Sequence, residues 1–82
     1  MEYLLSITYN QKPGFVIRIA LILERRNFEI KSLIIEEKES YKFSEMKLKV
    51  YGPEEKIEQV EKQIAKLIDV VRVEKFMEME LV

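Results

Sequence analysis

Glycine and proline each occur only twice in the 82-residue chain, and in both places they are neighbours: Pro13–Gly14 and Gly52–Pro53. Proline holds φ at about −65°, and glycine accepts backbone angles that other residues avoid, so each pair predicts a tight turn. Before each turn apolar and polar residues alternate, and after each turn the apolar residues recur with helical spacing. The chain therefore contains two strand-turn-helix units.

The first unit combines a half-buried strand with an unusually apolar helix. In residues 2–9 apolar side chains alternate with Ser6 and Thr8, which predicts a strand with one buried face. The turn "NQKPG" follows, and from 15 to about 26 we expect a helix that Asn27 ends in a left-handed conformation. Only two of the first ten residues of this helix are charged. One sheet cannot cover so much apolar surface, so we expect a homodimer or a larger assembly.

Three further segments have strand patterns. We expect strands at 28–36, 42–51 and 69–76, with a turn at 36–40 and a continuation of the last alternation through Met77, Met79 and Leu81. The strand at 28–36 is expected to have apolar groups on both faces, with Phe28, Ile30 and Ile34 on one and Leu33 and Ile35 on the other. After Gly52–Pro53 we expect a helix with a single apolar stripe, formed by Ile57, Val60, Ile64 and Leu67.

The order strand-helix-strand-strand-helix-strand predicts an α+β fold of the ferredoxin-like βαββαβ type. Two right-handed crossovers would place both helices on one face of a four-stranded antiparallel sheet. The charged residues that alternate through 42–51 would then lie on the other, solvated face. No linker or repeat divides the sequence, so we expect residues 1–82 to form a single domain.

The composition argues against several classes of function. The chain has neither cysteine nor histidine, which removes thiolate nucleophiles, the usual zinc ligands and the commonest proton-transfer group. Its net charge of −1 provides no field to attract nucleic acid, and "KFSEMKLKV" at 42–50 lacks the glycines of an RNA-recognition strand. The N-terminus has no basic region, and no apolar run approaches the roughly 20 residues that span a bilayer. We therefore expect a soluble, cytoplasmic protein that is not an enzyme and binds no metal, nucleic acid or membrane.

The turn before the first helix is the best candidate for a binding site. Exposed backbone N–H groups at a helix N-terminus, together with the helix dipole, favour a carboxylate, so a free amino acid is the natural type of ligand. A turn that only connects a strand to a helix could have the same residues, and the sequence leaves that alternative open.

Two parts of the chain carry a resemblance to a known family. The segment from Ile7 to Leu33, and "EKIEQVEKQIAKLIDVVRVEKF" at 55–76, resemble the ACT domain of the regulatory (small) subunit of acetolactate synthase, also called acetohydroxyacid synthase. The resemblance implies dimers with continuous sheets and an amino-acid site at the dimer interface. The implied site residues are Gln11, Lys12, Pro13, Gly14, Phe15 and Val16 of one subunit with Glu29, Ile30 and Lys31 of the other.

The resemblance also implies a function. Such a subunit has no catalytic residue. It binds and activates the catalytic subunit of acetolactate synthase, an enzyme of branched-chain amino-acid biosynthesis, and that catalytic subunit holds thiamine diphosphate, magnesium and FAD. In many cases the small subunit also transmits inhibition by valine. This chain would be the short kind with an ACT domain alone, and no cofactor is expected in it. Two alternatives stay open: a free-standing amino-acid-sensing ACT module for another enzyme or a transcriptional response, and a dimerisation domain without a ligand.

Two positions depart from the family pattern. Gln11 and Glu29 stand where valine-responsive members commonly have asparagine. An ionised glutamate can only accept hydrogen bonds and would repel a ligand carboxylate, so we expect valine to bind weakly or not at all.

Overall fold

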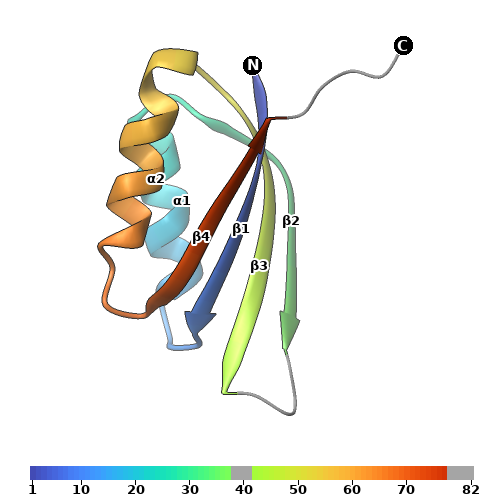
Figure 1. Cartoon of the computed structure of the whole chain (residues 1–82), viewed down its shortest axis with the longest axis vertical. Coiled ribbons are helices and arrows are strands. Elements are labelled where there is room, and N and C mark those ends of the chain that lie inside the picture. The colour runs from blue at the N-terminus through green and yellow to red at the C-terminus, as the bar shows by residue number, and fades with distance from the viewer. Residues whose placement is uncertain (38–41, 78–82) are drawn as a thin grey trace.

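The four strands form one antiparallel sheet in the order β2-β3-β1-β4, with β2 and β4 at its edges. This computed structural model describes residues 1–37 and 42–77. Its helices lie on one face of the sheet (Figure 1), which confirms the ferredoxin-like fold. The elements are β1 (Glu2–Asn10), α1 (Phe15–Arg25), β2 (Glu29–Glu37), β3 (Phe43–Tyr51), the 3₁₀ turn η1 (Glu54–Lys56), α2 (Ile57–Ala65) and β4 (Val70–Met77).

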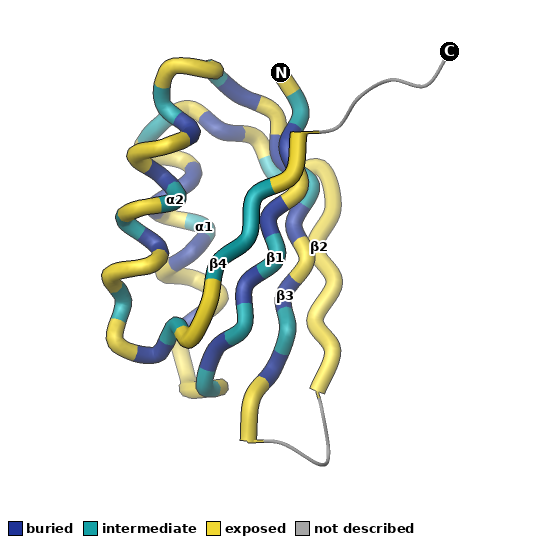
Figure 2. The backbone as a smooth tube through the Cα atoms, viewed as in Figure 1, coloured by how far each residue is buried: buried dark blue, intermediate teal, exposed yellow. Residues whose placement is uncertain are grey.

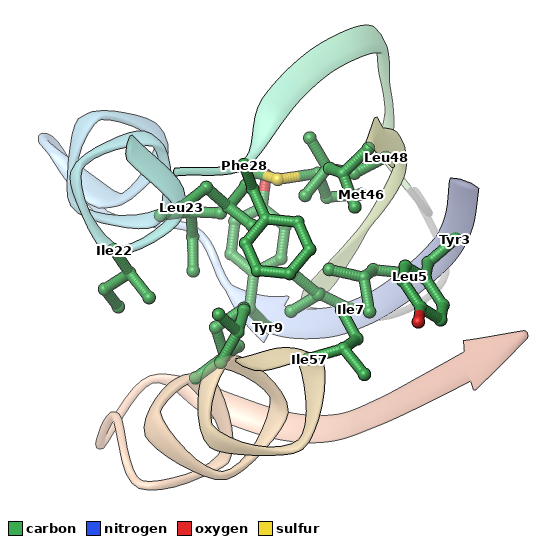
Figure 3. Close-up of a cluster of buried hydrophobic side chains, with 14 of the residues drawn as sticks. Tyr3, Leu5, Ile7, Tyr9, Ile22, Leu23, Phe28, Met46, Leu48 and Ile57 are labelled. Carbon is green, nitrogen blue, oxygen red and sulfur yellow. The ribbon is translucent and has the colours of Figure 1, made fainter. Parts of the chain in front are cut away.

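The core lies between the helices and the two central strands, as Figure 2 shows. Alternate residues of β1 and β3 are buried and face each other across the ladder, including Leu5 opposite Leu48 and Ile7 opposite Met46. Figure 3 shows several of these side chains meeting those of the helices. The helices bury Phe15, Ile19, Ile22 and Leu23 from α1 and Ile57, Val60 and Ile64 from α2. Each such side chain contributes about 1.5–3 kcal/mol when fully buried, so the strict alternation fixes which sheet face is covered.

The predicted faces of β2 were wrong in one respect. Ile30 lies opposite Val50, but Ser32 lies opposite Lys49, so the register shifts by one residue at Lys31. Such a bulge inverts the alternation of all later residues. Leu33 and Ile35 therefore share the helix-covered face with Ile30, whereas Ile34 lies on the open face.

The connection from α1 to β2 is tight. Asn27 takes the predicted left-handed conformation, with φ of 63°. The N–H of Phe28 donates to the carbonyl of Leu23 at 2.9 Å, which closes the helix end. Phe28 is buried and packs edge-on against Tyr3, with 6.5 Å between ring centroids. The start of β2 is thereby fixed to the core.

Some predictions fall outside the described residues. The predicted turn at 36–40 overlaps β2, which continues to Glu37. The remaining positions of that predicted turn, 38–40, lie outside the described residues. The last strand includes Met77, and the positions of Met79 and Leu81 lie outside them as well. Of the described helices, none has the length and hydrophobicity that crossing a bilayer requires.

Candidate functional site

The turn between β1 and α1 needs glycine because of its backbone and not because of its packing. Gly14 has φ of 83°, in the left-handed region that residues with a Cβ seldom adopt. A Cβ added at this position would meet no atom within 4 Å. The N–H of Arg18 donates to the carbonyl of Gly14 at 3.1 Å, so the helix begins directly after the turn. The outer side of this turn is therefore open.

The inner side of the turn is held by Asp69, the only aspartate of the chain. The N–H of Asn10 donates to the Asp69 carbonyl at 2.7 Å, and the Lys12 ammonium lies 3.0 Å from the Asp69 carboxylate. The Asp69 side chain is only 11% exposed, whereas that of Lys12 is 63% exposed. One residue of the α2–β4 connection thus anchors the turn through both its backbone and its side chain.

A pocket of about 200 Å³ lies beside the open side of the turn. Five of the predicted site residues line it: Gln11, Lys12, Gly14, Phe15 and Val16. The structure adds Tyr9, Ile17 and Ile35 to this lining. Pro13 is not among the lining residues, nor are Glu29, Ile30 and Lys31 of the same subunit.

Two stacked aromatic rings support the pocket. The rings of Tyr9 and Phe15 are nearly parallel, at 8°, with centroids 4.1 Å apart, and both residues are buried. Burial raises the pKa of Tyr9 above 10, the nearby Glu37 carboxylate raises it further, and a hydrogen bond with Ser44 partly opposes this rise. Tyr9 is therefore neutral at physiological pH, and its ring is stacked on that of Phe15.

The residues that line the pocket include both hydrogen-bond donors and apolar side chains. Within the described residues, the N–H groups of Val16 and Ile17 have no backbone acceptor, as is usual in the first turn of a helix. Gln11, whose amide can donate, and Lys12, whose ammonium is paired with Asp69, line the pocket with them. The side chains of Val16, Ile17 and Ile35 are apolar and are 37%, 66% and 38% exposed. A small molecule with an anionic end and an aliphatic end would match this arrangement.

Comparison with known proteins identifies the family. A family model described as the AHAS small subunit-like ACT domain matches residues 5–72. The chain belongs to this family. It is 35% identical over 78 residues to a probable acetolactate synthase small subunit of Archaeoglobus fulgidus, covering 95% of this chain and 49% of that protein. It is 38% identical over 69 residues to the acetolactate synthase small subunit of Mycobacterium avium, covering 84% and 41%.

A solved structure agrees with this assignment. The crystal structure of the acetolactate synthase small subunit from Thermotoga maritima superposes with a TM-score of 0.76 and 37% identity, over 92% of this chain and 47% of that one. The present ACT domain thus spans about half the length of the relatives that it matches.

The three predicted residues of β2 lie at the other end of this ACT domain. β1 and β2 are each antiparallel to β3, so they run parallel to each other, and the start of β2 is far from the turn that follows β1. Glu29 instead lines a more open hollow with Tyr51 and Gly52. Its carboxylate lies 3.2 Å from the Lys31 ammonium, and both side chains are substantially exposed. Within one subunit, these residues cannot contribute to the pocket at the turn.

One edge of the ACT domain is strongly apolar, and the pocket opens beside it. β2 is exposed over most of its length in Figure 2, unlike the central strands. We call its exposed apolar residues together with those of α1 the β2–α1 surface: Val16, Ile17, Leu21, Leu33 and Ile35 on the helix-covered side, and Ile34 on the open face of the edge strand. Natural proteins seldom leave a long apolar edge strand uncovered.

Local chemistry could predict only part of this site. The turn residues were found because glycine, proline and the helix start are adjacent in sequence. Tyr9 could have been included, since it is the last apolar residue of the preceding alternation. Ile35 reaches the pocket only because of the bulge in β2, for which the sequence of β2 alone has no signal.

Proposed function

We propose that this ACT domain is a non-catalytic regulatory subunit of acetolactate synthase. In this proposal it forms a dimer through the β2–α1 surface, binds an amino acid in the pocket beside Gly14, and binds and activates the catalytic subunit. Thiamine diphosphate, magnesium and FAD are assigned to that catalytic subunit. The observation that supports ligand binding best is that one pocket is lined by aliphatic side chains and by residues with backbone N–H groups that are unpaired within the described part of the chain. Membership of the family supports the enzyme partner.

A two-fold dimer would complete the pocket. If two copies of β2 lie antiparallel across a symmetry axis, the start of each strand comes beside the end of the other. Glu29, Ile30 and Lys31 of the partner subunit would then approach the turn that carries Gly14. This arrangement accounts for a site with residues from opposite ends of one domain, and it would cover the exposed side chains of Leu33 and Ile35.

The enzyme partner is tested by reconstitution. The chain is mixed with the acetolactate synthase catalytic subunit of the same source, and acetolactate formation from pyruvate is assayed with and without it. We expect co-elution of the two proteins and a higher turnover. Unchanged turnover without co-elution would reject this partner and favour an amino-acid-sensing module that serves another enzyme or a transcriptional response.

The dimer is tested by light scattering at micromolar concentration, where we expect at least twice the monomer mass of 9.9 kDa. Ile34→Glu places a charge on the exposed edge strand β2, between Leu33 and Ile35 in sequence, and should shift the mass to that of the monomer. Lys47→Glu is the matched control, because Lys47 lies opposite Ile34 on β3 but outside the β2–α1 surface. A native monomer would reject the proposed dimer.

A further inference from the structure

Ser44 has a buried hydroxyl close to the proposed site. It lies on β3 directly opposite Tyr9, and it is only 3% exposed. Ser44 and Asp69 are the two buried residues with polar or charged side chains in the described part of the chain. A buried hydroxyl is unfavourable unless it is hydrogen-bonded. The Ser44 hydroxyl donates to Oε1 of Gln11 at 2.9 Å, across 33 positions of sequence.

This hydrogen bond restricts what Gln11 can offer to a ligand. A glutamine amide has one oxygen that accepts and one nitrogen that donates. When Ser44 holds the oxygen, the group that remains for the pocket is the NH₂ donor. The neighbouring N–H groups of Val16 and Ile17 are also donors. The polar side of the pocket therefore presents donors from three residues.

We propose that Ser44 is a positioning residue, which holds the Gln11 amide so that the pocket selects a carboxylate over a carboxamide. The inference rests on the proposed amino-acid site and adds a determinant of its selectivity. A carboxylate offers acceptors on both oxygens, whereas a carboxamide would turn its own NH₂ toward a donor. Without the Ser44 hydroxyl, the Gln11 amide can rotate so that its oxygen faces the pocket and accepts a hydrogen bond from a carboxamide. The preference for a carboxylate over a carboxamide should therefore decrease.

The orientation of Gln11 is tested first, without any ligand. The side-chain amide resonances of Gln11 are followed by NMR in the native chain, in Ser44→Ala and in Ser44→Thr, which retains a hydroxyl. We expect shifted and more mobile Gln11 signals in Ser44→Ala and near-native signals in Ser44→Thr. Ser6→Ala is the matched control, because Ser6 lies on the open sheet face, opposite Lys47. Unchanged Gln11 signals in Ser44→Ala would overturn the proposal.

Selectivity is tested next with valine, leucine and isoleucine and with the amide of each, by chemical-shift titration that also measures millimolar binding. For at least one pair, we expect the native chain to prefer the acid at least about tenfold, because a hydrogen bond to a charged group is stronger than one to a neutral group. Ser44→Ala should lose most of that preference. Ser44→Thr should restore it. Binding with an unchanged preference in Ser44→Ala would overturn the role of Ser44 alone. Absence of binding by all six compounds would instead overturn the amino-acid site itself.

Discussion

The two glycine-proline turns both lead from a strand into a helix, but each needs its glycine for a different reason. At Gly14 the backbone is left-handed, and the space beside it is empty. At Gly52 the backbone is not left-handed, but an added Cβ would overlap the ring of the buried Phe28. One glycine therefore supports an open turn with a pocket beside it, whereas the other leaves room for the core. Similar sequences thus mark a candidate binding turn and a packing contact.

The surroundings of the two turns agree with this difference. Gly52 exchanges hydrogen bonds with Met1: its N–H donates to the Met1 carbonyl at 3.0 Å, and its carbonyl accepts from the N-terminal ammonium at 3.1 Å. The turn at Gly14 is anchored at the residues that precede the glycine, by Asp69 at Asn10 and Lys12 and by Ser44 at Gln11. A change at Gly52 should therefore affect stability, and a change at Gly14 should affect mainly binding.

Gly52→Ala is expected to have the largest effect on stability. The new methyl group would overpack the core against Phe28, which typically destabilises by about 1–3 kcal/mol and occasionally more. Urea unfolding of the variant and the native chain measures this difference. Phe28→Leu in the same chain should recover part of it, because the two positions are in contact. A Gly52→Ala variant as stable as the native chain would remove the basis of the comparison.

Gly14→Leu should destabilise less and abolish any response to an amino acid. The left-handed backbone makes a side chain unfavourable by about 1–2 kcal/mol, but no atom lies where the Cβ would be placed. The side chain would extend from the turn beside the pocket. We expect cooperative urea unfolding with a reduced midpoint, together with loss of ligand-induced NMR shifts. A variant that responds normally would place the ligand elsewhere.

Glu29 bears on both turns. It lines the hollow beside Gly52 of its own subunit, and it is proposed to reach the Gly14 turn of the partner subunit. We expect valine to bind the native chain with a millimolar or weaker Kd, because Glu29 and the ligand carboxylate repel each other. Its pairing with Lys31 reduces that repulsion, so Glu29→Asn should tighten valine binding only about tenfold, or about 1.4 kcal/mol.

Calorimetric titration measures this change, and Gln11→Asn should add to it. Glu54→Asn is the control, because Glu54 lines the hollow beside Gly52 but has no proposed role at the turn. Submillimolar valine binding by the native chain would contradict the prediction, and so would equal effects of Glu29→Asn and Glu54→Asn.

The smallest effect at neutral pH is expected for the two buried tyrosines, one near each turn. The pKa of Tyr3 is raised by burial and then by Glu54 and Glu55, and the pKa of Tyr9 is raised by burial and then by Glu37. Both folded-state values lie above the unfolded value of about 10, so the stability linked to them is complete below that pH and is lost as the pH rises further. Tyr3→Phe and Tyr9→Phe should each reduce the loss of stability in urea unfolding above pH about 10. Identical alkaline profiles of the native chain and both variants would contradict this.

The sequence was sufficient for the fold where the alternation is unbroken. β1 and β3 were predicted with their buried faces, because each follows one period throughout. Of the predicted stripe of α2, Ile57, Val60 and Ile64 are buried in the helix, but Leu67 was wrongly included, since α2 ends at Ala65 and Leu67 packs on the core from the connection to β4. The faces of β2 were not predicted correctly, because its bulge arises from pairing with β3 and has no local signal. The same limit applies to the site. The turn residues were predicted from local chemistry, whereas the contact between Ser44 and Gln11 depends on the register of β1 with β3, which no single segment specifies.

The bulge at Lys31 has a consequence for which insertions and deletions this ACT domain can tolerate. A deletion in a surface turn changes the length of a connection and leaves the faces of the neighbouring strands as they were. A deletion of Lys31 would remove the extra residue and restore simple alternation, and it would leave Leu33 and Ile35 on the helix-covered face with Ile30. A deletion of Ile34, where no bulge takes up the change, would instead turn Ile35 to the open face. In an aligned chain, a one-residue gap at Lys31 is therefore compatible with the same edge paired without a bulge, whereas a one-residue gap later in β2 would signal a different edge.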